Sequence, residues 1–100
     1  EEPTYYANTS KVSTSQFASG SIIEGEVVQS VLSRNIHVHK DSVVKDSILF
    51  PRVVIGQGAQ VEYAILDKGV EVADGVVIRG TAEHPVVVKK GEKVTEDIHS

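Results

Sequence analysis

Two histidines give this sequence its clearest opportunity for chemistry. His37 and His39 flank Val38, and the alternation of side chains along a strand would turn both imidazoles outward on one face. An outward imidazole can act as a general base or bind a metal ion. His84 and His99 lie in non-repetitive sequence and add no third ligand. We therefore interpret the pair as surface histidines and predict neither a catalytic residue nor a metal site.

Three basic residues form a second candidate site. Arg34, Arg52 and Lys68 each follow an aliphatic residue by two or three positions, which would place them at one corner of successive coils. Such a corner is a candidate site for an anionic, phosphorylated effector. The alternative is an ordinary solvated corner.

The acidic residues show no comparable pattern. Glu24 with Glu26, and Asp41 with Asp46, are interpreted as charges at strand edges and corners. No Ser/His/Asp arrangement can be argued from spacing, so no nucleophilic centre is predicted.

A ladder of apolar residues, spaced five or six apart, indicates the elements that must position these side chains. Its rungs are Val12, Phe17, Ile22, Val27, Leu32, Val38, Val44, Leu49, Ile55, Val61, Leu66, Val72 and Ile78. Two residues before each rung stands a small or aliphatic residue, from Ser10, Ser15, Gly20 and Gly25 through to Val70 and Val76. Neither column contains a charge, although 24 of the 100 residues are charged. Both columns are therefore predicted to line one interior.

The ladder also has a longer period from Val38 onward, since every third rung recurs at the same interval. This interval would align Val44, Val61 and Ile78 on one wall. The spacing suits neither a helix nor a lone strand, but it suits a short strand and a corner, three times per turn. The prediction is an all-β parallel β-helix, a triangular prism of about four coils. One such interval after the two histidines stand Val54 and Gly56, which add no metal ligand.

The corners are predicted from residues that tolerate a positive φ. When successive coils are aligned at this interval, they form two sets: Asp41, Gly58 and Gly75, and Asn35, Arg52 and Gly69.

Three segments are predicted along the chain. Residues 1–11 read as an entry segment or linker, 12–80 as the β-helix, and 81–100 as a C-terminal extension. The ladder is expected to stop after Ile78, and the extension to form a short strand and hairpin from Val86 onward.

An outward aliphatic stripe is expected on one side of the prism. Val31, Ile48 and Ile65 each stand one residue before a rung and recur at the interval of one coil. The stripe is a candidate interface with another domain or subunit. The alternative is that β-branched residues simply favour strands.

Composition excludes several classes of protein. A net charge of −4 argues against a nucleic-acid surface, and the absence of cysteine rules out disulfides and thiolate metal sites. No apolar run is long enough to span a membrane, and a cytoplasmic location is expected. Because the chain opens Glu1-Glu2-Pro3 rather than with Met, we expect a fragment of a longer protein.

The segments Val38–Val43 and Ile55–Gln60 resemble hexapeptide repeats, which implies a left-handed coil. The stretches Asp46-Ser47-Ile48-Leu49 and Ala64-Ile65-Leu66-Asp67-Lys68-Gly69-Val70 resemble the C-terminal domain of glucose-1-phosphate adenylyltransferase. The resemblance covers roughly residues 12–80. It implies a parent that joins ATP and glucose 1-phosphate, with magnesium, for glycogen synthesis. No cofactor is expected in this fragment, and its partners would be its own N-terminal catalytic domain and neighbouring subunits.

Two departures favour the regulatory (D-type) subunit. Catalytic-type members tend to carry basic residues where this chain has Glu62-Tyr63, and the stretch 81–88 resembles the regulatory type. Two alternatives stay open. One is a hexapeptide-repeat acyltransferase trimer that uses His37 or His39 and binds coenzyme A. The other is a purely structural solenoid.

Overall fold

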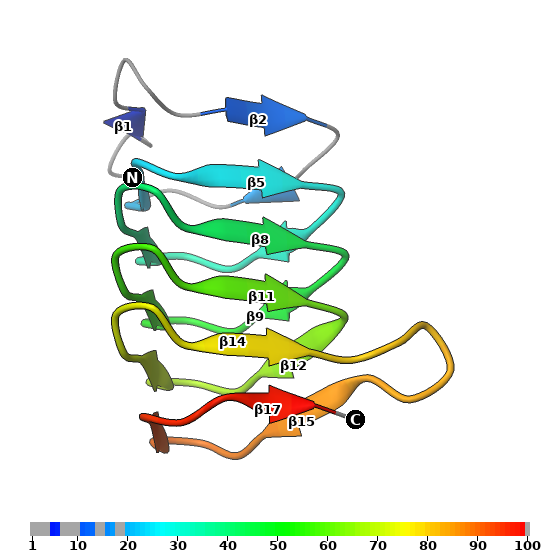
Figure 1. The fold of residues 1–100 in the computed structure, drawn as a ribbon. Helices are drawn as coiled ribbons and strands as arrows, with labels where there is room; N and C mark the ends of the chain where they lie inside the picture. The colour runs from blue at the N-terminus through cyan, green and yellow to red at the C-terminus, as the bar shows by residue number, and fades with distance from the viewer. Residues whose placement is uncertain (1–4, 7–10, 14–15, 18–19, 100) are drawn as a thin grey trace.

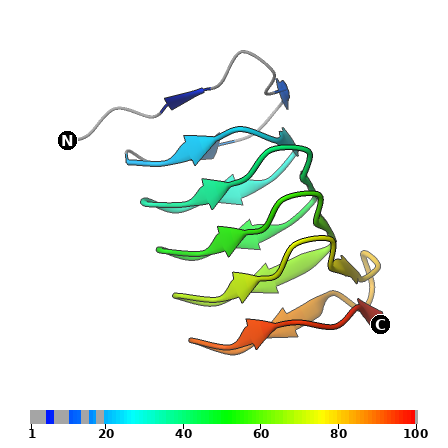
Figure 2. The same cartoon turned by 60° about the vertical axis from the view of Figure 1, so that its left-hand side comes forward.

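The chain folds into a three-sided prism of stacked coils (Figure 1). This computed structural model describes the backbone of residues 5–6, 11–13, 16–17 and 20–99, and the side chains of residues 20–99. Residues 20–99 contain no helix, and their strands are two or three residues long. Strands that follow one another in the sequence lie in different sheets, so each coil contributes one strand to each side (Figure 2).

The three sheets are parallel, and we number them by their first strand. The first sheet contains β1 (Tyr5–Tyr6), β4 (Ile22–Ile23), β7 (His37–Val38), β10 (Val54–Ile55), β13 (Glu71–Val72) and β16 (Lys93–Val94). The second contains β2 (Lys11–Ser13), β5 (Glu26–Val28), β8 (Val43–Lys45), β11 (Gln60–Glu62), β14 (Val77–Arg79) and β17 (Ile98–His99). The third contains β3 (Gln16–Phe17), β6 (Val31–Leu32), β9 (Ile48–Leu49), β12 (Ala64–Leu66) and β15 (Val86–Val88).

The rungs from Val27 to Ile78 form the predicted interior. Val44 and Ile78 both pair in register with Val61, which confirms that the three share one wall. The column two residues before the rungs is buried as well, including its serines. Two of these serines are part of the hydrogen bonding: Ser30 Oγ accepts from the Ser47 backbone, and Ser47 Oγ accepts from the Ala64 backbone, each at 3.2 Å. The hydroxyl groups of these buried serines thus have hydrogen-bond partners inside an otherwise apolar column.

The two predicted sets of corner residues adopt the left-handed backbone. The φ angles are +63° at Asp41, +59° at Asn35 and +65° at Arg52, and the aligned glycines are similar. The third corner, which the sequence pattern does not predict, uses Gln29, Asp46 and Tyr63 with φ of +47° to +49°. Each of these regular corners therefore turns through a single left-handed residue.

The coil that begins with β4 corrects the predicted ladder. Ile22 is 38% exposed and Ile23 is fully buried, because Ile22 pairs with His37 and Ile23 with Val38. The buried position two residues earlier is accordingly Ser21 rather than Gly20. Ile22 and Ile23 are both uncharged and apolar, so the absence of charge along the ladder does not decide which of them is the rung.

A shortened corner explains the shift. Only three residues separate Ile23 from Val27, so the coil from Val12 to Val27 is two residues shorter than the coil from Val27 to Val44. Gly25 makes this corner possible: a Cβ there would lie 2.5 Å from the Ser42 carbonyl oxygen. The predicted rungs Val12 and Phe17 pair in register with Val27 and Leu32. Ser10 and Ser15 lie outside the described residues.

The ladder also continues past Ile78, which corrects the expectation that it stops there. Strand β15 pairs with β12, β16 with β13 and β17 with β14, so the predicted hairpin does not form and the prism has about five coils. The interval from Leu66 to Val88 is longer than the regular one, because the exposed loop at 81–85 projects from the side of the prism (Figure 1). The division of the chain into domains stays a prediction.

Candidate functional site

The two histidines face outward from the first sheet, as the sequence predicts. Val38 between them is buried, whereas the side chains of His37 and His39 are 33% and 39% exposed. Their rings stack with centroids 3.7 Å apart and an interplanar angle of 17°. The backbone N–H groups of both residues donate to the next coil, at Val53 and Ile55, so the strand itself holds the pair in place.

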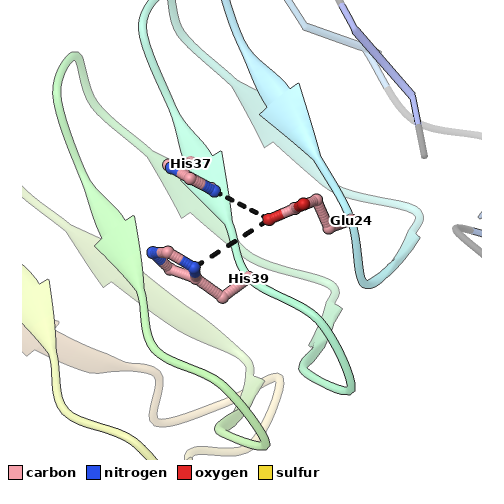
Figure 3. A group of neighbouring side chains, drawn as sticks. All are labelled: Glu24, His37 and His39. Carbon is pink, nitrogen blue, oxygen red and sulfur yellow. Dashed lines mark hydrogen bonds and ion pairs between the residues drawn. The ribbon is translucent and has the colours of Figure 1, made fainter.

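Glu24 completes a cluster that was not predicted from the sequence. Its Oε1 accepts a hydrogen bond of 2.9 Å from His37 Nε2 and lies 3.9 Å from His39 Nδ1 (Figure 3). The backbone of Glu24 donates to the Val38 carbonyl at 2.8 Å, which fixes the residue beside the histidine strand. The expectation that no third ligand type lies near the histidines is therefore wrong. The interpretation of Glu24 as a strand-edge charge did not include this contact with His37.

The shortened corner is the reason for that error. Glu24 precedes His39 by the length of the short coil, whereas the regular ladder predicts neighbours at the interval of a full coil. Recognising Ile23 as the rung would have placed Glu24 directly beside His39 in the outward column. The sequence therefore contains the alignment of Glu24 with His39, but this alignment follows only if Ile23, and not Ile22, is the rung.

The arrangement supports two kinds of chemistry. A carboxylate that accepts from one imidazole nitrogen fixes the tautomer of the ring and leaves the other nitrogen as an acceptor, which is the arrangement of a general base. The same three side chains each offer one ligand atom within 4.8 Å of the others, a set that can hold a metal ion. The side chain of Glu24 is 35% exposed, so both kinds of site would be open to solutes.

A shallow groove of about 280 Å³ begins beside His39 on the same face. The residues that line it include Gly56, Glu71, Ala73 and Lys93. His39 therefore lies at the edge of an open groove on the first sheet.

The predicted aliphatic stripe lies on the third sheet. Val31, Ile48 and Ile65 pair in register on successive strands, and Val87 on β15 extends the row to a fourth coil. Val31, Ile48 and Val87 are 49%, 41% and 65% exposed, while Ile65 is half-buried. We call these four residues the aliphatic stripe. Its use as an interface stays a prediction.

The three basic residues lie at one corner on successive coils, with Arg52 one position later in the register than Arg34 and Lys68. The Arg52 backbone donates to the Arg34 carbonyl at 3.3 Å, and Lys68 lies on the next coil, beside Gly69, whose backbone donates to Pro51. All three side chains are exposed. Binding of an anionic effector at this corner stays a prediction.

Comparison with known proteins decides the family. The model of the GlmU-like C-terminal hexapeptide family matches residues 4–98. The chain belongs to this family. The β-helix is accordingly the left-handed one of hexapeptide repeats, as the resemblance of Val38–Val43 and Ile55–Gln60 implies.

A solved structure shows the same fold. WeeI from Acinetobacter baumannii AYE superposes with a TM-score of 0.55 at 19% identity, over 94% of this chain. This chain spans 50% of the length of that structure. No curated protein matches the sequence. Within the described residues, no helix has the length and apolar character needed to cross a membrane.

Proposed function

We propose that this chain is an assembly and regulatory domain of a glucose-1-phosphate adenylyltransferase, closest to the regulatory type of subunit. The parent joins ATP and glucose 1-phosphate to give ADP-glucose and pyrophosphate. ATP and magnesium would bind in its separate catalytic domain. The hexapeptide fold supports a member of this enzyme class, and the resemblance of the segment at 64–70 favours this particular parent.

The aliphatic stripe is the observation that carries the assembly role. Four in-register aliphatic side chains on one flat face expose apolar area in a row along the prism. Contact between such an apolar row and water is unfavourable. Another protein surface that covers the row removes this contact and so stabilises the assembly. The stripe is continuous over four coils, so a partner surface can lie along the whole face.

The local charge at β11 favours the regulatory type. Glu62 lies where catalytic members tend to be basic, and its carboxylate is 3.6 Å from the guanidinium of Arg79. A carboxylate at this place repels an anionic effector, and it also forms an ion pair with Arg79. The effector response of the parent would then depend on its other subunits.

The test is the assembly state of the parent protein. The double variant Ile48→Glu/Ile65→Glu places two charges in the middle of the stripe, and it is expected to dissociate the assembly in analytical ultracentrifugation. The control Val43→Glu/Gln60→Glu places two charges at paired outward positions on the second sheet. It is expected to leave the assembly intact. An unchanged assembly for the stripe variant would sink the proposal.

The hydrogen bond between Glu24 and His37 favours a second candidate, a hexapeptide-repeat acyltransferase. Here the imidazole would take the proton of an acceptor hydroxyl or amine while coenzyme A lies between neighbouring prisms of a trimer. Calorimetric titration with acetyl-coenzyme A decides between the candidates. Binding of acetyl-coenzyme A by the wild-type chain would favour the acyltransferase, and no heat of binding would remove it.

A further inference from the structure

Among the described residues, Glu24, His37 and His39 form a cluster of the ligand types that zinc prefers. Two imidazoles and one carboxylate form a mixed nitrogen and oxygen set, which suits first-row transition cations rather than calcium or magnesium. The two histidines stand on either side of Val38 in one extended segment, so both project from the same face. The carboxylate reaches them from the neighbouring coil.

We propose that these three side chains bind one Zn²⁺ ion per chain. The proposal is independent of the assembly role. It adds a ligand site on the first sheet, whereas the aliphatic stripe lies on the third.

The distances suit a tetrahedral ion after small side-chain movements. Zinc bonds of about 2.0–2.1 Å place neighbouring ligand atoms about 3.4 Å apart. Glu24 Oε1 lies 2.9 Å from His37 Nε2 and 3.9 Å from His39 Nδ1, which brackets this separation. Because all three side chains are partly exposed, each can rotate without disturbing the interior.

Zinc would replace the proton of the hydrogen bond between His37 and Glu24. The carboxylate oxygen faces both ring nitrogens, and the hydrogen bond places a proton on His37 Nε2. When the ion binds, that nitrogen presents its lone pair instead, and the proton moves to the other ring nitrogen or to solvent. The stacked rings must also rotate away from their 17° interplanar angle so that both lone pairs converge on the ion.

Three protein ligands leave the fourth position open. One carboxylate offsets half of the charge of Zn²⁺, so the occupied site carries a net positive charge and attracts water, hydroxide or a small anion. His39 also lines the groove on the first sheet, so a molecule in the groove could reach the open position.

The test is titration of the chain with Zn²⁺ in competition with a chromogenic chelator. The expected result is one ion per chain, with at least tenfold weaker binding in Glu24→Gln and no binding in His37→Gln/His39→Gln. The control variants Glu26→Gln and His84→Gln change a nearby acidic residue on β5 and an exposed loop histidine. They are expected to match the wild type.

Cobalt gives a second readout that does not depend on affinity. Co²⁺ bound to the wild-type chain is expected to show the intense visible absorption of a tetrahedral ion, which Glu24→Gln reduces. Three results would overturn the proposal. They are an absence of stoichiometric binding, an affinity that Glu24→Gln leaves unchanged, and equal losses in the two control variants. None of them bears on the assembly test, so the two proposals fail separately.

Discussion

The first and third sheets of the prism share one interior but differ completely on the outside. Along the third sheet, the outward position is aliphatic on four successive coils, from Val31 to Val87. Along the first sheet, the same kind of position changes at every coil, and it includes His37, Glu71 and Lys93. Beneath both faces the rungs are equally buried.

This difference separates what the fold requires from what it leaves free. Stacking of coils requires aliphatic or small residues inside, because each rung packs on the rung of the next coil. Nothing in the stacking constrains the outward positions, which only need to favour a strand. A face that keeps one residue type over four coils, or that gathers imidazoles beside a carboxylate, therefore carries information beyond the fold.

The largest expected effect tests the shared interior. Leu49→Ala, beneath the aliphatic stripe, and Ile55→Ala, beneath the first sheet, each remove a fully buried side chain. Each is expected to lower the free energy of unfolding by about 2–5 kcal/mol, measured by urea denaturation. A much smaller loss under one face would mean that the two walls are not packed alike.

Zinc tests the first sheet next. At about 100 times its dissociation constant, an ion that binds only the folded chain adds about 2.7 kcal/mol of stability. Thermal denaturation with and without Zn²⁺ measures the gain. The variant Glu24→Gln should show a smaller gain than the wild type.

The shortened corner at Gly25 supports the zinc cluster of the first sheet and, within the described residues, has no counterpart beneath the aliphatic stripe. In Gly25→Ala the new Cβ would meet the backbone of Ser42 at 2.5 Å, which overpacks the corner and costs about 1–3 kcal/mol. Gly58→Ala is the control, since its Cβ would meet no atom within 4 Å and only the left-handed backbone resists it. Both variants are followed by urea denaturation. Only Gly25→Ala is expected to weaken zinc binding as well, because it displaces Glu24. Equal zinc affinities in the two variants would contradict this role of the corner.

The smallest expected effect is on outward residues in the isolated chain. Ile48→Ser on the third sheet and Val54→Ser on the first each replace a partly exposed aliphatic side chain on a strand. Each is expected to change the free energy of unfolding by less than about 1 kcal/mol. Ultracentrifugation of the parent should separate them, since only Ile48→Ser is expected to weaken assembly. A similar loss in both would show that the stripe has no special part in it.

The regular body of the fold could be predicted from sequence because it repeats. Between Val38 and Ile78 the coils have full corners, so the alignment of successive coils and the absence of charge agree at every rung. The ends could not be predicted in the same way. A corner shortened at Gly25 and a loop inserted at 81–85 each shift the spacing, and a search at fixed spacing then loses the ladder.

The candidate site could be predicted only in part, for the same reason. Strand alternation alone turns His37 and His39 outward, and the structure confirms that orientation. The contribution of Glu24 depends on the neighbouring coil, and therefore on a register that the shortened corner changes. Contacts within one strand follow from local sequence, whereas contacts between coils need the correct count of residues per turn.

The loop at 81–85 marks where this chain accepts extra length. All five residues are exposed, and the strands on either side keep their register with β11 and β12. Lengthening such a loop costs little entropy. A short epitope or a fluorescent label inserted between Glu83 and His84 would thus give a handle on the folded protein, clear of every flat side of the prism.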